Sequence, residues 1–300
     1  RSADTPGRGG GRDGRNSEAP RGRPVVPGGP TEPGLLRELN LPFELPHAFL
    51  GLDEEASALE TASSLILPVP YESTTSWGGG TSRGPGAILE ASRYVELWDQ
   101  ELAADPSSLG VHTLPALELT RAGAVPAMEE LRDTYEQILD AAHGVFPVML
   151  GGEHSISAPA IQAVAAREER RLHVLQLDAH ADLRDQYEGT PASHASAMRR
   201  VLDVADVVGV GIRGISREEM DVAESEEGVT LIFGEEIWED DGWMDRALDH
   251  LGDPVYLTFD VDFLDPSLMP STGTPEPGGG DWYRTLRFLK RVFREREVLA

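Results

Sequence analysis

Short apolar runs alternate along the chain with longer segments in which apolar residues recur at helical spacing. The apolar runs predict buried strands at residues 63–70, 145–150, 172–177, 207–212, 229–233 and 255–259. Helical spacing predicts helices at residues 126–142, 156–167, 216–226, 235–251 and 284–297, and one more that starts at about Ala87. Because strand and helix alternate almost strictly, we expect an α/β fold with a parallel sheet that is covered by helices on both faces.

The first part of the chain has a different pattern. Residues 1–34 are rich in Gly, Pro and Arg and contain too few large apolar side chains to offset the entropy of ordering, so we expect a disordered extension. Residues 35–45 are apolar enough to form a short turn or helix that docks on the body. The predicted organisation is therefore an extension at 1–34 and one folded domain at 35–300.

Composition excludes several kinds of partner and chemistry. The formal net charge is −26, so nucleic acid is not an expected partner and a cationic substrate is favoured. The absence of cysteine excludes disulfides, thiolate ligands and cysteine nucleophiles. No apolar run approaches the roughly 18 residues of a membrane span, and the N-terminus lacks the apolar core of a signal peptide, so we expect a cytoplasmic protein without a membrane partner.

A polar triplet follows the strand predicted at 172–177. Asp178, His180 and Asp182 stand at every second position, so in an extended segment their side chains leave the same face. Two carboxylates and an imidazole on one face are costly unless a cation neutralises them. The triplet therefore indicates a metal site, and the alternative is a solvated acidic turn that contains an incidental histidine.

Two more strands deliver similar side chains. The strand at 255–259 runs into Asp260 and Asp262, and the strand at 145–150 runs into a glycine turn that presents His154. The carboxyl ends of parallel strands form one edge, where ligands bind in open α/β sheets. A set of four carboxylates and two imidazoles suits a pair of Mn²⁺ ions better than a structural zinc ion. The six candidate ligands are His154, Asp178, His180, Asp182, Asp260 and Asp262.

These motifs carry a family resemblance. Gly-Gly-Glu-His-Ser at 151–155, Asp-Ala-His-Ala-Asp at 178–182 and Thr-Phe-Asp-Val-Asp-Phe-Leu-Asp-Pro at 258–266 resemble the three metal signatures of the ureohydrolases, the arginase and agmatinase family. Residues 70–75 and 84–92 resemble the family's N-terminal signature. The resemblance implies a three-layer fold with a mostly parallel eight-stranded sheet, two Mn²⁺ ions, and a homo-oligomer that is a trimer or a hexamer.

The resemblance also implies roles for single residues. Asp178 and Asp260 would bridge the two ions, His154 and Asp182 would complete one site, and the remaining ligands would complete the other. A hydroxide held between the ions would attack the carbon of a guanidinium and release urea and an amine. His194 matches the family's loop histidine and would carry a proton to the leaving amine. The alternative for His194 is a surface residue near a helix end.

The residues after Asp182 bear on the substrate. Arginases typically carry an asparagine there, whereas this chain has Leu183 and Arg184, which resembles the agmatinase branch. We therefore expect hydrolysis of agmatine to putrescine and urea, a step in polyamine biosynthesis. The alternatives are another guanidino substrate, namely guanidinobutyrate, aminopropylagmatine, guanidine or arginine, and a catalytically silent homologue that binds metal.

The remaining polar residues near these motifs receive simpler interpretations. Asp265 precedes a proline and is expected to shape a turn, while Glu276 is a secondary candidate for substrate contact on a nearby loop. The histidines without acidic neighbours at ligand spacing are expected to be structural or on the surface; they are His112, His143 and His173. Residues 298–300 resemble the start of a further strand, which in the family carries a guanidinium-binding glutamate, so we expect the sequence to be a fragment of a longer protein.

Overall fold

The structure is a computed structural model that describes residues 47–300, which lie in the compact unit Leu45–Ala300. The predicted extension at 1–34 and the apolar segment at 35–45 lie outside the described residues. No helix among residues 47–300 is long and apolar enough to cross a membrane.

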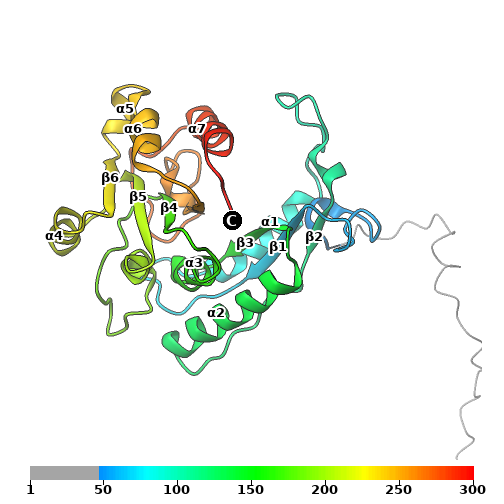
Figure 1. Cartoon of the computed structure of the whole chain (residues 1–300), viewed down its shortest axis with the longest axis horizontal. Coiled ribbons are helices and arrows are strands. Elements are labelled where there is room, and N and C mark those ends of the chain that lie inside the picture. The colour runs from blue at the N-terminus through cyan, green and yellow to red at the C-terminus, as the bar shows by residue number, and fades with distance from the viewer. Residues whose placement is uncertain (1–46) are drawn as a thin grey trace, which may run out of the picture. The chain divides into compact units, whose positions relative to one another are not determined.

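The strands of the described residues form two parallel sheets (Figure 1). The three-stranded sheet has the order β2-β1-β3 and consists of β1 (Ser64–Val69), β2 (Val111–Thr113) and β3 (Phe146–Gly151). The four-stranded sheet has the order β6-β5-β4-β7 and consists of β4 (Leu172–Leu177), β5 (Ala205–Ile212), β6 (Val229–Phe233) and β7 (Val255–Phe259). The predicted parallel α/β class is thus confirmed, and β2 is a short strand that the apolar pattern does not reveal.

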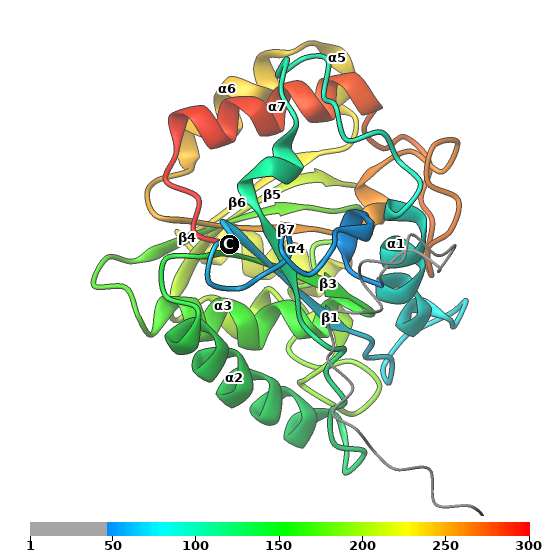
Figure 2. The same ribbon diagram turned by 90° about the vertical axis from the view of Figure 1, so that its right-hand side faces the viewer.

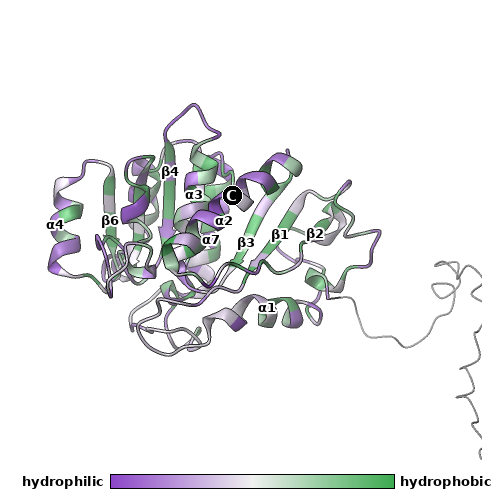
Figure 3. Ribbon diagram, turned by 90° about the horizontal axis from the view of Figure 1, so that it is seen from below, coloured by the Kyte–Doolittle hydropathy of each residue, from purple (hydrophilic) through white to green (hydrophobic). Residues whose placement is uncertain are grey.

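The last three residues extend the four-stranded sheet. Val298 forms a parallel bridge with Val255, and the Leu257 N–H donates a hydrogen bond of 2.9 Å to the carbonyl of Ala300. The predicted start of a further strand at 298–300 therefore pairs beside β7 as a strand does. In Figures 1 and 3 this segment lies between the two sheets.

The helices of residues 47–300 are α1 (Gly84–Ser92), α2 (Ala124–Ala141), α3 (Ser157–Ala165), α4 (Arg217–Ser225), α5 (Glu236–Glu239), α6 (Gly242–His250) and α7 (Trp282–Glu295). Of these, α1 contacts β1 and β3 of the three-stranded sheet, while other helices cover both faces of the four-stranded sheet (Figure 2). The single helix predicted at 235–251 is wrong, because the chain is extended at Asp240, whose carboxylate accepts a hydrogen bond of 2.6 Å from the Gly242 N–H. Figure 2 shows α6 and α7 on one side of the sheet and α2 and α3 on the other.

Alternating side chains of the strands separate the core into two clusters. In β4, Val174 packs in the cluster that contains Ile161 of α3, whereas Leu175 packs in the cluster that contains Trp243 of α6 and Phe288 of α7. Each of these side chains is at most 2% exposed, and such burial stabilises the fold by about 1.5–3 kcal/mol per large apolar side chain. The two clusters fix the sheet between its helices and hold the carboxyl ends of its strands at one edge.

Candidate metal centre

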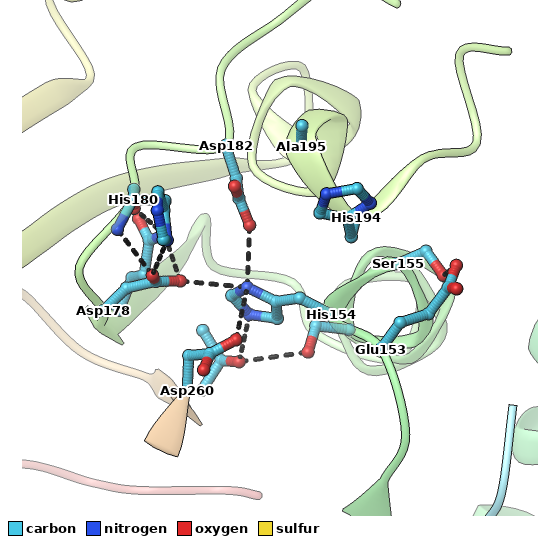
Figure 4. Close-up of polar contacts among 12 residues, drawn as sticks. Glu153, His154, Ser155, Asp178, His180, Asp182, His194, Ala195 and Asp260 are labelled. Atoms are coloured by element: carbon cyan, nitrogen blue, oxygen red, sulfur yellow. Dashed lines mark hydrogen bonds and ion pairs between the residues drawn. The ribbon is translucent and has the colours of Figure 1, made fainter. Parts of the chain in front are cut away.

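The predicted ligands leave three strands at one edge of the fold (Figure 4). Leu177 of β4 pairs with Phe259 of β7, so Asp178 and Asp260 leave neighbouring strands at the same level. The Asp260 N–H donates to the carbonyl of Leu177 at 2.9 Å, which holds this register beyond the end of the strands. His154 follows β3 of the other sheet, so side chains from both sheets converge on one centre.

Three carboxylates surround the imidazole of His154. Its Nδ1 atom lies 2.8 Å from Asp182 Oδ2, 3.0 Å from Asp178 Oδ2 and 3.7 Å from Asp260 Oδ2. Its Nε2 atom lies 2.9 Å from the hydroxyl oxygen of Thr258, which fixes the plane of the ring. The ligand atoms of His154, Asp178 and Asp260 lie within 4.8 Å of one another, which is close enough for one cation to contact all three.

A second group shares Asp178 with the first. The Nδ1 atom of His180 lies 3.0 Å from Asp262 Oδ2 and 3.7 Å from Asp178 Oδ1. Asp178 therefore turns one carboxylate oxygen toward His154 and the other toward His180, as a carboxylate between two cations would. The structure brings all six predicted ligands together, and their binding of metal remains a prediction.

Hydrogen bonds to the outer side of the ligands hold them in these positions. Asp178 accepts hydrogen bonds from the His180 N–H at 2.7 Å and from the side-chain amide of Gln176 at 3.0 Å. The Ala179 N–H donates to Asp262 Oδ1 at 3.0 Å. Asp182 has a φ of 52°, a left-handed conformation that costs a non-glycine residue about 1–3 kcal/mol and is kept where the surrounding structure requires it.

Burial and mutual repulsion control the charges in this centre. Burial, followed by the charges of Asp260 and Asp182, raises the pKa of Asp178, and burial also raises the pKa of both of these neighbours. Burial alone would lower the pKa of His180, but the hydrogen bond and charge of Asp262 raise it to about 9. Likewise, Asp178 and Asp182 outweigh burial and raise the pKa of His154 well above its usual value. Without a cation the centre holds protons, and this oxygen-rich set of donors fits divalent cations such as Mn²⁺.

His194 lies beside this centre, where Figure 4 shows it near Asp182 and His154. Burial is the largest cause that lowers the pKa of His194, so the ring is neutral near pH 7. Its Nδ1 atom lies 3.2 Å from the hydroxyl oxygen of Thr74, and its Nε2 atom lies 3.1 Å from that of Ser76. Sequence reasoning missed both hydroxyl residues, and it missed Glu153, although that buried glutamate lies inside the Gly-Gly-Glu-His-Ser motif.

A loop that borders the centre is held by an arginine that the sequence did not reveal. The guanidinium of Arg213 donates to the main-chain carbonyls of Glu276 at 2.7 Å and of Asp262 at 2.6 Å. The predicted turn role of Asp265 is confirmed, because its carboxylate accepts hydrogen bonds from the N–H groups of Ser267 and Gly278, and the Ser267 bonds together with that of Gly278 lower its pKa to about 2.

The histidines that sequence analysis set aside lie outside the centre. His112 Nδ1 lies 2.7 Å from the carbonyl oxygen of Ser57, which is a structural contact. Within residues 47–300, neither group of metal-ligand side chains includes His112, His143 or His173.

The fold and the centre together define a class: an α/β protein with a carboxylate-rich candidate metal site at the carboxyl ends of parallel strands. Residues 62–300 match the model of the Arginase family, so the chain belongs to that family. It is similar to N(1)-aminopropylagmatine ureohydrolases from a Synechocystis species (35% identity, 83% of each chain) and from Thermus thermophilus (39% identity, 82% of this chain and 83% of the relative). It is also similar to the solved agmatine ureohydrolase of Thermoplasma volcanium, with 27% identity, a TM-score of 0.73, and coverage of 88% of this chain and 86% of that one.

These findings confirm the predicted family and its agmatinase-like branch. The protein is a ureohydrolase, a hydrolase that acts on guanidino C–N bonds.

Proposed function

We propose that this ureohydrolase uses two Mn²⁺ ions to hydrolyse agmatine to putrescine and urea. The observation that carries the proposal is the orientation of Asp178, whose two oxygens face two different groups of ligand side chains. A carboxylate in this position would hold two cations close together, which is the arrangement that activates a shared water.

The six ligands would divide between the ions as the family resemblance implies. His154 and Asp182 would belong to one ion and His180 and Asp262 to the other, with Asp178 and Asp260 between them. When bound, the two ions supply a hydroxide nucleophile near neutral pH and offset the negative charge that develops during attack.

Residues of the chain itself would transfer the proton that the leaving amine requires. His194 is neutral near pH 7 because burial lowers its pKa, so it can take up a proton at its basic nitrogen and pass it to the departing amine. The hydroxyl groups beside both ring nitrogens orient the imidazole for this transfer.

The charge of the protein favours a substrate with two positive groups. The formal net charge of −26 attracts a dication such as agmatine more strongly than the zwitterion arginine. A second candidate substrate is N(1)-aminopropylagmatine, which carries a further amine; two relatives at 35% and 39% identity bear names that contain this compound.

Urea release from a panel of guanidino compounds tests the proposal. We expect manganese-dependent turnover of agmatine or aminopropylagmatine, weaker turnover of arginine and guanidinobutyrate, and no turnover by Asp260→Asn. The matched control is Asp265→Asn, the same chemical change at a carboxylate that shapes a turn in the same segment. Manganese-independent urea release, or a preference for guanidinobutyrate or arginine, would reject the proposal.

A further inference from the structure

The carboxylate of Glu153 is buried and accepts four hydrogen bonds. Its Oε2 atom accepts from the main-chain N–H groups of Ser73 at 2.6 Å and Thr74 at 2.7 Å. Its Oε1 atom accepts from the hydroxyls of Thr74 and Ser155, each at 2.7 Å. Glu153 is only 3% exposed, and an ionised carboxylate can only accept hydrogen bonds, so the hydroxyl proton of Thr74 must point at Glu153.

The hydrogen bond from the Thr74 hydroxyl to Glu153 limits the hydrogen bonds that the Thr74 oxygen can make with His194. A hydroxyl has one proton and two lone pairs, so once its proton is given to Glu153 the oxygen can only accept. It accepts from the main-chain N–H of His194 at 3.1 Å and lies 3.2 Å from Nδ1 of the same residue. The contact with Nδ1 is a hydrogen bond only if Nδ1 carries the proton, and in a neutral ring Nε2 is then the basic nitrogen.

The other neighbours of the ring are compatible with this assignment. The Ser193 hydroxyl oxygen lies 3.3 Å from Nδ1 and accepts from the N–H of Ala195, so it is placed to share the Nδ1 proton. On the other side, the exposed Ser76 hydroxyl donates to the hydroxyl of Tyr187 at 3.2 Å and lies 3.1 Å from Nε2. A hydroxyl rotates, so the same proton can turn from Tyr187 to an unprotonated Nε2. Nε2 therefore faces the open side of the site.

We propose that Glu153 and Thr74 are positioning residues that fix the tautomer of His194. Through the Thr74 hydroxyl, the buried carboxylate keeps the proton on Nδ1 and leaves Nε2 as the nitrogen that exchanges a proton with the reaction. The use of Nε2 in catalysis rests on the proposed function, whereas the tautomer rests on the hydrogen bonds alone.

Replacing Glu153 with glutamine should move the ring proton of His194 from Nδ1 to Nε2. The main-chain N–H groups of Ser73 and Thr74 cannot reverse, so the glutamine oxygen must take the place of Oε2 and its NH₂ group must face the Thr74 hydroxyl. That hydroxyl then accepts from the new amide and donates its own proton to Nδ1 of His194, which moves the ring proton to Nε2.

Nitrogen-15 NMR of histidine-labelled full-length protein measures this directly, because protonated and unprotonated ring nitrogens differ widely in chemical shift. Spectra would be recorded at about pH 8, where a neutral ring predominates, with Mg²⁺ in place of paramagnetic Mn²⁺. The His194 signals are those that disappear in His194→Asn. We expect protonated Nδ1 in the unmodified protein and protonated Nε2 in Glu153→Gln. Protonated Nε2 in the unmodified protein, or an unchanged tautomer in a folded Glu153→Gln variant, would overturn the proposal.

A pair of Thr74 variants keeps the test independent of whether Glu153→Gln folds. Thr74→Ser retains the hydroxyl and should keep kcat within about twofold, whereas Thr74→Val has the same shape without the hydroxyl and should lose at least tenfold in kcat with little change in KM. General acid–base catalysis by a positioned side chain contributes about 10²–10⁴-fold, which sets the upper limit of this loss.

Equal activity of the two Thr74 variants, whether high or low, would overturn the catalytic part of the proposal, because the hydroxyl would then have no specific role. Manganese content should be the same in both variants, since neither change alters a predicted ligand. If the unmodified protein releases urea from no guanidino compound but shows the expected tautomer, the proposed function fails and the assignment of the Nδ1 proton stands.

Discussion

The structure predicts that Asp260→Asn has opposite effects on thermal stability in the metal-bound and the metal-free protein. The side chain of Asp260 is about one quarter exposed, and burial together with the charge of Asp262 raises its pKa. Its Oδ1 atom accepts from the Asp262 N–H at 3.1 Å, which an asparagine oxygen can still do. The change therefore removes one charge from a repulsive cluster and leaves this hydrogen bond in place.

The magnitude follows from the linkage between metal binding and folding. An ion present at 100 times its Kd stabilises the folded state by about 2.7 kcal/mol, so two ions contribute about 5 kcal/mol. For a domain of this size each kcal/mol corresponds to roughly 2–4 °C in Tm, so manganese should raise the Tm of the unmodified protein by about 10–20 °C. In Asp260→Asn the increase should fall to less than half, because Asp260 is a predicted ligand in the first group and the predicted second bridge.

Thermal unfolding of both proteins, with a chelator or with manganese, measures these quantities. In the chelator we expect the Tm of Asp260→Asn to equal or exceed that of the unmodified protein, since repulsion is relieved. The control Asp265→Asn should have a lower Tm in the chelator, because its carboxylate accepts two main-chain hydrogen bonds, but should keep the full increase with manganese. A large, equal manganese response in Asp260→Asn and the unmodified protein would refute the assignment of this ligand.

Three further predictions concern pH, substrate and the loop at 276–277. The pKa of His180 is raised from 6.5 to about 9, so its pairing with Asp262 stabilises the metal-free protein fully below pH 6.5 and is lost as pH rises through about 9. Manganese must displace this proton, so its affinity should rise at least about tenfold per pH unit between 6.5 and 9, and a flat profile in calorimetric titrations would contradict this. The kcat/KM for agmatine should be at least tenfold higher than that for arginine, a difference of about 1.4 kcal/mol in transition-state binding. Equal values would contradict agmatine as the preferred substrate. Arg213→Met should lower Tm and raise KM, because it removes the hydrogen bonds from the charged guanidinium to the carbonyls of Asp262 and Glu276, each worth about 1.5–3 kcal/mol. An unchanged Tm and KM would contradict the role of Arg213 in holding the loop at 276–277.

Most of the fold is predictable because buried parallel strands are nearly continuous apolar runs. The bounds of β4, β6 and β7 agree with the runs themselves. The break at Asp240 is not visible in the apolar pattern, since Ile237, Met244 and Leu248 continue at helical spacing on both sides and are buried in the same cluster. The Asp240 carboxylate accepts a hydrogen bond from the N–H of Gly242, the first residue of the following helix, and periodicity contains no information about such a local bond.

The convergence of the six predicted ligands follows from the sequence for a related reason. Each carboxylate and imidazole stands within a few residues of the end of an apolar run, and the carboxyl ends of parallel strands meet at one edge. The roles of Gln176 and Thr258, which hold Asp178 and His154 from behind, were not predictable, because within a strand they read as ordinary polar interruptions. Gln176 contacts Asp178 two residues further along its own segment, whereas Thr258 of β7 contacts His154 from the other sheet, a contact that only the tertiary structure reveals.

The network around His194 depends on the pairing of β1 with β3. Val69 pairs with Gly151, so the segments that follow the two strands, with Thr74 in one and Glu153 in the other, start side by side although 79 residues separate them. His194 lies 120 residues after Thr74 and belongs to the segment that follows β4, in the other sheet. Glu153 and Thr74 thus connect the three-stranded sheet to the histidine of the four-stranded one. His154, next to Glu153, makes the same crossing to Asp178 and Asp260, so the predicted proton-transfer histidine and the predicted metal ligands are held by the same segment. Variants of Glu153 should therefore be judged by the Nδ1 proton of His194 and by bound manganese together, because a shift of the whole segment would change both, whereas loss of the hydroxyl relay would change only the first.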